Sequence, residues 1–224
     1  MPEYSVTTEA LYQGNHIRGM EMHPETIPCF LTTAFTMKGF KEVQETYDTK
    51  GYTYIRTRNP NRTALGEVIS CLEGGEESLI FSSGMGAITT TLMAVLEPGD
   101  HVICNANIYG EIFSVMTDIL KKFGVDVTFA DYQIPGAAAK AIRPETKLIY
   151  SEVLSNPTLT LVDLKAMADL AHENGALLMV DNTFTTPIAI RPMDFGADIV
   201  INSLTKFLNG HSDAIGGSIT ASAE

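Results

Sequence analysis

From about residue 60 onward, the chain alternates between short apolar runs and longer segments with helical spacing. Gly and Pro residues separate the two kinds of segment, as at Gly74-Gly75 and Pro98-Gly99. In the longer segments, apolar residues recur on one helix face, for example at Leu65, Ile69 and Leu72. Short strands that alternate with helices form βαβ units and a mostly parallel sheet. The sequence therefore predicts an α/β fold, a mostly parallel sheet flanked by helices.

The alternation also predicts the order of the elements. We expect strands at 78–82, 101–105, 126–130, 147–152, 176–180, 198–203 and 217–221, the first of them buried. We expect helices at 62–72, 85–96, 111–123 and 161–174. Residues 1–60 are rich in Thr, Gly, Pro and Tyr and are expected to form an extended, irregular N-terminal arm. Residues 61–224 are then expected to form a single domain.

Composition excludes several classes of protein. The formal net charge of −12 argues against nucleic acid or an anionic membrane as the main partner. An odd number of cysteines without a CxxC pair (Cys29, Cys71 and Cys104) indicates reduced thiols and a cytoplasmic location. Residues 1–16 contain neither the basic nor the apolar region of a signal peptide. No apolar run approaches the roughly 20 residues that a membrane-spanning helix needs.

Polar residues gather where the expected strands end. Ser83-Gly84, Asn105, Glu152, Asp181 and Ser203 all stand at the carboxyl end of an expected strand. In open parallel sheets, ligands bind at this edge. The shared location predicts a ligand site built from these positions.

Lys206 and Asp181 match the two ends of pyridoxal phosphate. The amine of Lys206 can form a Schiff base with the aldehyde, and partial desolvation near the ring would lower the pKa of that amine. The carboxylate of Asp181 can hold a proton on the pyridine nitrogen, so that the ring acts as an electron sink. Hydroxyl groups of Ser203 and Thr205 can donate to the phosphate. The alternatives are a surface lysine and a capping aspartate.

A glycine-containing turn at residues 82–87 supplies a second phosphate-binding element. It joins an expected strand to an expected helix with the sequence Ser-Ser-Gly-Met-Gly-Ala. Backbone N–H groups at a helix N-terminus bind anions, and glycine allows a close approach. Ser83, Gly84 and Met85 are therefore candidates for binding the phosphate.

Two other kinds of bound group are disfavoured. The dinucleotide fingerprint GxGxxG is only partly present, because Thr89 stands where the third glycine belongs after Gly84 and Gly86. The next expected strand ends in Asn105 rather than in an acid that could bind a ribose. No metal is expected, since the histidines lack ligand spacing; they are His16, His23, His101, His172 and His211.

These motifs together resemble the cystathionine γ-synthase/γ-lyase family of Cys/Met-metabolism pyridoxal-phosphate enzymes. The resemblance runs over nearly the whole chain and includes Ser203-Leu204-Thr205-Lys206, Asp181 and a Tyr-x-Arg-x-x-Asn-Pro segment that starts at Tyr54. It implies the large domain of a fold-type-I enzyme. It also implies a homotetramer, built as a dimer of dimers.

The resemblance assigns further roles by position. Tyr109 would stack on the pyridine ring and take part in catalysis, and Asn156 would bond the 3-oxygen of the ring. Tyr54 and Arg56 would reach the phosphate of the neighbouring subunit's cofactor. The alternatives are a tyrosine packed on the core, an Asn-Pro turn and an exposed basic loop.

The function implied by the resemblance is γ-elimination on a sulfur amino acid, as in cystathionine or methionine γ-lyases. The alternatives are γ-replacement, as in cystathionine γ-synthase or O-acetylhomoserine sulfhydrylase, and a catalytically incomplete fragment. Glu111-Ile112 follows Tyr109-Gly110 where methionine γ-lyases typically have a cysteine, which weakens that assignment. Family members are nearly twice as long. We therefore expect an N-terminal portion without the C-terminal domain and without the arginine that binds the substrate carboxylate.

Overall fold

A seven-stranded sheet forms the centre of the computed structural model, which describes residues 5–13 and 24–222. The strands are β1 (Glu77–Phe81), β2 (His101–Asn105), β3 (Asp126–Ala130), β4 (Thr146–Glu152), β5 (Leu177–Asp181), β6 (Ile199–Asn202) and β7 (Gly217–Ala221). Their order across the sheet is β1-β7-β6-β5-β4-β2-β3. The prediction of a mostly parallel sheet is confirmed, since only β7 runs antiparallel to its neighbours. Residues 203–216 contain no crossover helix, so β7 turns back beside β6.

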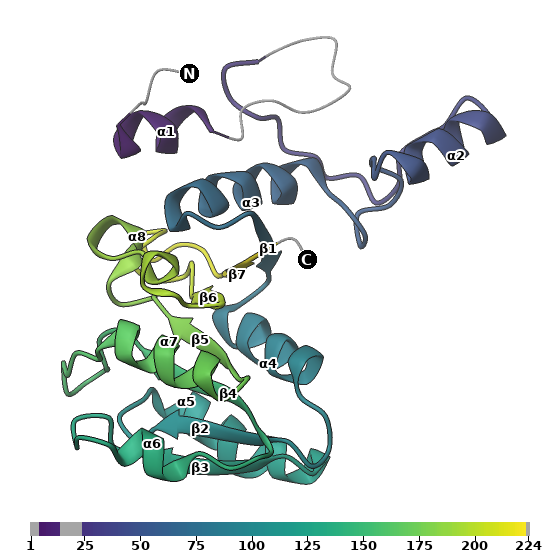
Figure 1. Cartoon of the computed structure of the whole chain (residues 1–224). Helices are drawn as coiled ribbons and strands as arrows, with labels where there is room; N and C mark the ends of the chain where they lie inside the picture. The colour runs from purple at the N-terminus through teal and green to yellow at the C-terminus, as the bar shows by residue number, and fades with distance from the viewer. Residues whose placement is uncertain (1–4, 14–23, 223–224) are drawn as a thin grey trace.

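Helices cover both faces of the sheet (Figure 1). On one face, α4 (Gly84–Val95) and α5 (Gly110–Ser114) pack with Tyr150 and Met179 in one apolar cluster. On the other face, α6 (Ala137–Ala141) and α7 (Leu164–Glu173) pack with Val180 in a second cluster. Because strand side chains alternate, Met179 and Val180 enter different clusters although they are neighbours. The helices cover the faces of the sheet but not the carboxyl ends of its strands, so the loops there can form a ligand-binding site.

Local signals explain where α3 (Pro60–Glu73) begins and ends. The Asn59 side chain accepts a hydrogen bond from the backbone N–H of Arg62, and Pro60 stands at the first helical position. Gly74 ends the helix with φ +76°, a conformation that favours glycine. The helix bounds agree with the helix predicted at residues 62–72. The helix packs against β1.

Several elements differ from the sequence expectation. The segment expected as one helix at 111–123 divides into α5, a π-helical turn at Val115–Ile119 and a 3-10 turn at Leu120–Phe123. α7 begins at Leu164 rather than 161, because the Asp163 side chain caps it. The expectation that the first strand is buried is wrong: β1 is an edge strand and stays partly exposed. The sequence analysis also missed α6, α8 (Thr186–Ala189) and a 3-10 turn at Pro192–Phe195.

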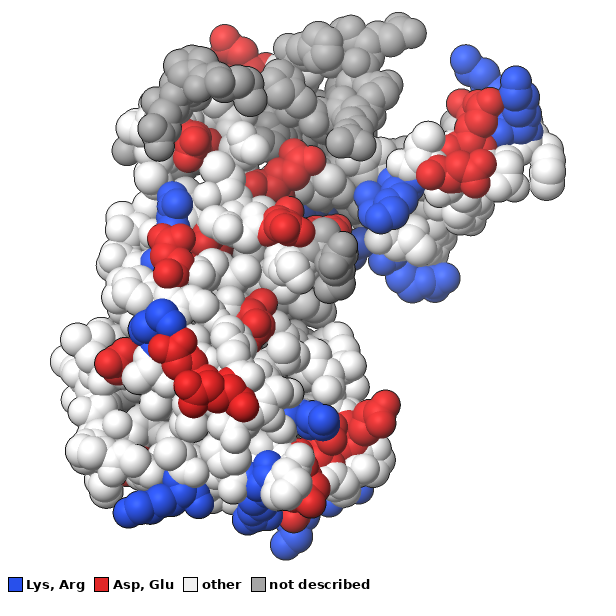
Figure 2. All heavy atoms as spheres, viewed as in Figure 1, with Lys and Arg blue, Asp and Glu red and all other residues white. Residues whose placement is uncertain are grey.

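The described part of the arm contains two helices, which corrects the irregular structure expected for residues 1–60. α1 (Val6–Tyr12) lies beside α3, and α2 (Phe40–Asp48) has no buried residue. Figure 1 shows α2 projecting away from the sheet. In Figure 2 this outer end of the arm carries both acidic and basic side chains. Within the described residues no helix is long and apolar enough to cross a membrane.

Part of the sequence expectation falls outside the described residues. The signal-peptide analysis rests on residues 1–16, of which 1–4 and 14–16 are not described. His16 and His23 are not described either. All three cysteines are described, and each is a free thiol.

Candidate functional site

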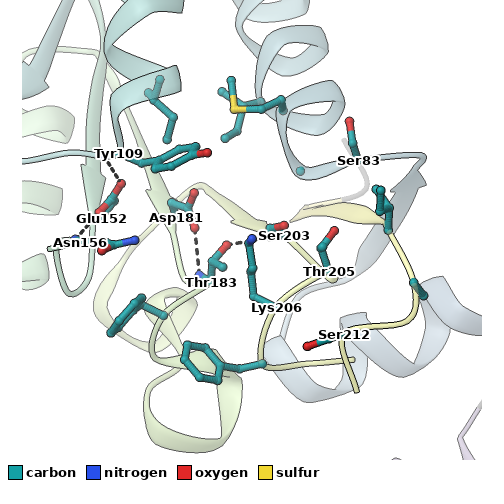
Figure 3. Close-up of a pocket in the computed structure, with 18 of the residues that line it drawn as sticks. Ser83, Tyr109, Glu152, Asn156, Asp181, Thr183, Ser203, Thr205, Lys206 and Ser212 are labelled. Atoms are coloured by element: carbon teal, nitrogen blue, oxygen red, sulfur yellow. Dashed lines mark hydrogen bonds between the residues drawn. The ribbon is translucent and has the colours of Figure 1, made fainter. Parts of the chain in front are cut away.

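A pocket of about 950 Å³ opens at the carboxyl ends of the strands. Figure 3 shows that its walls come from the start of α4, the loops after β4 and β5, and the loop after β6. Of the residues to which the sequence analysis gave an individual role, all but two line it, namely Ser83, Gly84, Met85, Tyr109, Asn156, Asp181, Ser203, Thr205 and Lys206. The two candidates that do not line it are Tyr54 and Arg56.

Lys206 lies in the loop that leaves β6. Backbone hydrogen bonds at both sides hold this loop: the Lys206 N–H donates to the Ser203 carbonyl at 3.2 Å, and the Gly210 N–H donates to the Lys206 carbonyl at 2.8 Å. Gly210 has φ +72°, which lets the chain turn. The side chain of Lys206 is exposed and lines the pocket.

Asp181 ends β5 with its carboxylate at the pocket. The Thr183 N–H donates to Oδ1 of Asp181 at 2.9 Å. Burial raises the pKa of the Asp181 carboxyl, and the hydrogen bonds from Thr183 oppose that rise. The nearby Tyr150 hydroxyl is buried and forms no hydrogen bond with any described residue.

Glu152 is a pocket residue that the sequence analysis placed at the ligand-binding edge without giving it an individual role. It ends β4 directly beside Asp181, and it is buried. Its carboxylate accepts the N–H of Tyr109 at 2.7 Å and the N–H of Asn156 at 3.2 Å. Burial raises the pKa of Glu152 to about 7, and the nearby Asp181 adds to the rise. The signal was visible as an acid at a strand end, but its backbone partners could not be read from the sequence.

The start of α4 forms the opposite wall. The Ser83 hydroxyl caps the helix by accepting the Gly86 N–H at 3.0 Å. No acceptor among the described residues takes the N–H of Gly84 or Met85, so both remain available to a ligand. A Cβ on Gly84 would lie 2.7 Å from the Cβ of Ser203, which explains the glycine. The helix start and the loop after β6 thus meet at one point.

The two hydroxyl groups of that loop differ in availability. The Ser203 hydroxyl has no hydrogen-bond partner among the described residues, although the Ser203 N–H donates to Thr183 Oγ1 at 2.7 Å. Thr205 Oγ1 is already bonded to Gly216, since it accepts the N–H at 3.1 Å and donates to the carbonyl at 3.2 Å. Ser203 can therefore bind an anion directly, whereas Thr205 must first release Gly216.

Aromatic side chains enclose the remaining sides. Tyr109 is 45% exposed, and its ring extends into the pocket above Asp181 in Figure 3. Phe184 and Phe207 form an edge-to-face pair with ring centroids 5.4 Å apart. The exposed Asn156 lies beyond Glu152 at the pocket edge. A planar ring can therefore lie between Tyr109 and the polar groups of the sheet edge.

Tyr54 and Arg56 lie on the arm. A short antiparallel contact holds this segment, with Ala34 opposite Tyr54. The Arg56 guanidinium lies over the Tyr54 ring, 5.1 Å from its centroid, and both side chains are exposed. Arg62 donates to the Arg56 carbonyl at 3.2 Å and so supports the turn. Neither candidate lines the pocket of its own chain.

The strand-end residue Asn105 also lies apart from the pocket. It is buried, and its side-chain oxygen accepts the Asn107 N–H at 3.2 Å. Asn105 therefore closes a turn after β2. Within the described residues no group of three or more His, Cys, Asp or Glu could hold a metal ion.

A lysine, an aspartate and a helix start lie around one pocket, which is the arrangement expected for the large domain of a fold-type-I pyridoxal-phosphate enzyme. Comparison with known proteins makes the class specific. Residues 7–224 match the model of the Cys/Met metabolism PLP-dependent enzymes. The chain belongs to this family, and the predicted fold, family and cofactor are confirmed.

Individual relatives cover most of this chain. It is 48% identical over 192 residues to cystathionine β-lyase of Bacillus subtilis, which is 86% of this chain and 47% of the relative. It is 50% identical over 175 residues to cystathionine γ-lyase of the same organism, 78% of this chain and 46% of the relative. The chain thus spans about half the length of these curated relatives.

A solved structure agrees with the fold. A putative O-acetylhomoserine (thiol)-lyase of Campylobacter jejuni superposes with a TM-score of 0.92 at 26% identity. The match covers 99% of this chain and 55% of that one. That structure carries a pyridoxyl-lysine phosphate.

Proposed function

We propose that this chain holds pyridoxal phosphate in the pocket through Lys206, Asp181 and the start of α4. The observation that supports this most strongly is that Lys206 and Asp181 line the same pocket as the free N–H groups of Gly84 and Met85. A lysine amine, a carboxylate and an anion-binding helix start match the aldehyde, the pyridine nitrogen and the phosphate of the cofactor.

Each residue has a distinct task in this proposal. When bound, pyridoxal phosphate supplies an electron sink for the charge that develops at the α-carbon of an amino acid. Lys206 binds the aldehyde end and later accepts the α-proton at Nζ. Asp181 holds the proton on the ring nitrogen, Tyr109 covers the ring face, and Asn156 orients the ring through its 3-oxygen.

The phosphate is held by a second group of residues. In this proposal, the N–H groups of Gly84 and Met85 and the hydroxyls of Ser83 and Ser203 donate to the phosphate. Thr205 joins them after releasing Gly216. Since backbone donors are fixed by the helix, they bind the anion without ordering a flexible side chain.

We further propose that the reaction is γ-elimination on a sulfur amino acid, with γ-replacement as the alternative. The similarity to a cystathionine γ-lyase and a cystathionine β-lyase supports a lyase. The similarity to a putative O-acetylhomoserine (thiol)-lyase keeps replacement as the second candidate. Glu111 is exposed at the start of α5, beside Tyr109, and weakens the case for methionine as the substrate. A cytoplasmic location belongs to this proposal.

Tyr54 and Arg56, in our proposal, complete the site of a neighbouring subunit in a homodimer, and two dimers form a homotetramer. The support is that both residues are exposed on the arm, outside the pocket of their own chain. The arm also exposes Leu31 (87%) and Phe40 (86%), large apolar side chains that a second chain can cover. The arginine fork suits a phosphate better than a lysine would.

Covalent labelling tests the cofactor proposal. The chain is incubated with pyridoxal phosphate, reduced with borohydride and mapped by peptide mass spectrometry. We expect a pyridoxyl group on Lys206, no label in Lys206→Ala, and full labelling in the control Lys140→Ala, which changes an exposed lysine on α6. Labelling spread over several surface lysines contradicts the proposal.

Product analysis tests the reaction. Cystathionine is supplied to the holoprotein, and an acylated homoserine is supplied with and without an added thiol. Keto acid and ammonia without the thiol support elimination. Formation of a new thioether only when the thiol is present, without keto acid, overturns elimination in favour of replacement. Labelled protein without turnover of either substrate supports the incomplete fragment.

A further inference from the structure

Glu73 is a fully buried carboxylate at the end of α3, outside the pocket. Its exposed fraction is 0%, and no described cation forms an ion pair with it. Two side-chain amides bind it instead: Asn182 donates to the two oxygens at 3.0 and 3.2 Å, and Asn202 donates at 2.6 Å. Burial raises the pKa of Glu73, and these amides oppose the rise. A buried carboxylate is costly, so its retention needs a reason.

The two asparagines stand next to the pocket residues in the chain. Asn182 follows Asp181, and Asn202 precedes Ser203. Side chains alternate across a sheet, so each asparagine points away from the face that its neighbour occupies. Val180 and Val200, which share the direction of the asparagines, pack in the cluster opposite the pocket. Glu73 therefore joins the ends of β5 and β6 through Asn182 and Asn202, on the face of the sheet opposite the pocket.

We call these contacts between the ends of β5 and β6 the junction, and further hydrogen bonds extend it to the pocket face. The Asn182 N–H donates to the Ile201 carbonyl at 2.8 Å, which extends the pairing of β5 and β6. The Ser203 N–H donates to Thr183 Oγ1 at 2.7 Å. Asn182 is also held by Thr185, whose hydroxyl donates to its side-chain oxygen at 2.5 Å. The relative position of Asp181 and Ser203 is thus set by a junction whose rear contact is Glu73.

We infer that Glu73 is a positioning residue for the cofactor pocket, holding Asp181 and Ser203 at the separation that the ring nitrogen and the phosphate require. This inference rests on the proposed roles of those two residues. An apolar side chain of similar size would fill the same volume behind the sheet. The Nδ2 groups of Asn182 and Asn202 both donate to Glu73, and an apolar side chain has no acceptor with which to join them. The carboxylate is therefore explained by the junction rather than by packing.

Three substitutions distinguish the effect of the Glu73 acceptor oxygens from the effect of its side-chain volume. Glu73→Leu keeps the size and removes the acceptor. Glu73→Gln keeps Oε1, to which Asn182 and Asn202 both donate, and replaces only Oε2, which Asn182 also reaches at the longer distance of 3.2 Å. Glu67→Gln changes an exposed glutamate on the same helix and serves as the control.

Amide hydrogen exchange on the cofactor-free chain is the first measurement. In Glu73→Leu we expect the amides of Asn182 and Ser203 to exchange about tenfold faster or more, while Val102 in β2 is unchanged. Glu73→Gln and Glu67→Gln should resemble the wild type. Unchanged exchange at both amides in Glu73→Leu overturns the inference, whatever the cofactor does. If Glu73→Leu does not fold, Asn202→Ala, which removes one donor to Glu73, takes its place. Unchanged exchange of the Ser203 amide in Asn202→Ala then overturns the inference.

Cofactor affinity is the second measurement. We expect Glu73→Leu to bind pyridoxal phosphate about tenfold more weakly or worse, and Glu73→Gln to restore the affinity to within about threefold. His101→Gln, at the opposite edge of the sheet, controls for a general loss of stability and should bind normally. Equal weakening in His101→Gln overturns a positioning role. If the wild type itself binds no pyridoxal phosphate, the proposed function fails, and the exchange data still decide whether Glu73 holds the junction.

Discussion

At the scale of the residue, two carboxyl groups that line the pocket, those of Glu152 and Asp181, are paired on neighbouring strands. Burial raises the pKa of both, that of Glu152 to about 7. The folded pKa of Glu152 then exceeds its unfolded value of about 4.3. The unfolded chain therefore loses its proton first, and stability falls as the pH rises between these two values. Below the window, Glu152 imposes no such penalty.

Glu152→Gln should remove this penalty. We expect the variant to gain stability relative to the wild type as the pH rises from about 4.5 to about 7, by roughly 1–3 kcal/mol, and then to level off. Glutamine keeps an acceptor for the Tyr109 N–H, so the loop stays anchored. Urea unfolding of both proteins at several pH values measures the difference. A difference that does not change with pH would mean that Glu152 is not the titrating group.

Gly84 tests the closeness of the helix start to the loop after β6. A Cβ there would lie 2.7 Å from Ser203 Cβ and 2.9 Å from its hydroxyl oxygen. Gly84→Ala should destabilise the fold by about 1–3 kcal/mol. It should also weaken binding of pyridoxal phosphate, because the cradle must widen. Gly110→Ala, where nothing lies within 4 Å of the added Cβ, is the control for thermal unfolding and binding. Equal behaviour of the two variants contradicts the prediction.

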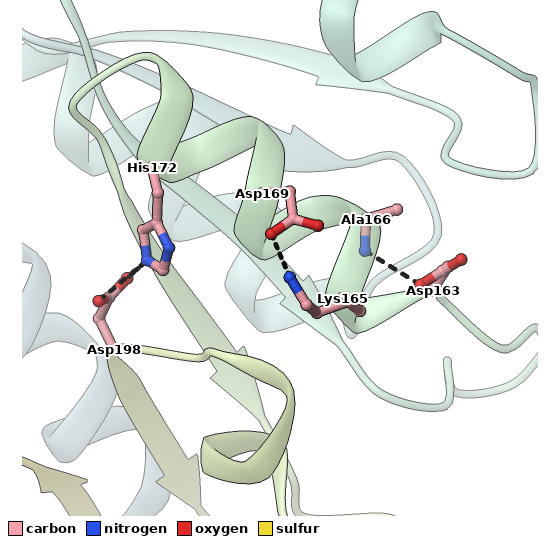
Figure 4. Close-up of polar contacts among 6 residues, drawn as sticks. All are labelled: Asp163, Lys165, Ala166, Asp169, His172 and Asp198. Atoms are coloured by element: carbon pink, nitrogen blue, oxygen red, sulfur yellow. Dashed lines mark hydrogen bonds and ion pairs between the residues drawn. The ribbon is translucent and has the colours of Figure 1, made fainter.

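At the scale of the element, α7 illustrates how unequal its polar contacts are (Figure 4). Asp163 caps the helix by accepting the Ala166 N–H at 3.0 Å, whereas Lys165 and Asp169 form an exposed ion pair. Asp163→Ala should lower the free energy of unfolding by about 1 kcal/mol. Lys165→Ala should lower it by less than about 0.5 kcal/mol, because solvent screens the pair. Chemical denaturation compares the two, and the reverse order would refute this ranking.

His101 joins three strands at the edge opposite the pocket. Its ring nitrogens bond Thr146 and Thr128 at 2.8 Å each, and the residue is 1% exposed. Burial lowers the pKa of His101, and Arg143 lowers it further. Stability from the neutral ring is therefore complete above the unfolded pKa of about 6.5 and is lost as the pH falls through the folded value.

His101→Gln should lack this acid-dependent loss. Its unfolding free energy, compared with that of the wild type, should improve as the pH falls below about 6.5. Above that value the variant should be the less stable protein, since one of the two threonine contacts is broken. Thermal unfolding between neutral and mildly acidic pH follows the change. Parallel curves for the two proteins would exclude His101 as the source.

The elements differ in how far the sequence could predict them. β2 and β3 were predicted to the residue, because Gly and Pro mark their limits and their side chains are largely apolar. α6 was missed because its five residues, Ala137–Ala141, are too few to show a helical periodicity. The pair of Lys206 and Asp181 was predictable from motifs at strand ends. Glu73 was not, since its partners lie 109 and 129 residues away and meet it only through tertiary packing.

At the scale of the whole molecule, the proposed dimer would divide the phosphate site between the pocket of one chain and the arm of the other. Figure 1 shows the arm leaving the sheet domain at α3. Arg56 and Lys206 of one chain should therefore serve different sites. In a dimer formed from one Arg56→Ala chain and one Lys206→Ala chain, one site has both native residues and the other has neither. The mixture regains one complete site although each variant alone has none.

Labelling of mixed variants measures this division. At limiting pyridoxal phosphate, Arg56→Ala alone should label weakly, because the phosphate loses a charge-assisted fork, and Lys206→Ala should not label at all. After mixing under conditions that exchange subunits, labelling on Lys206 of the Arg56→Ala chain should rise above the value before mixing. In a control mixture, the Lys140→Ala chain takes the place of the Lys206→Ala chain. It also supplies a native Arg56, and Lys206 of the Lys140→Ala chain is itself labelled. If the arm served its own chain, mixing would leave the Arg56→Ala chain as weakly labelled as before.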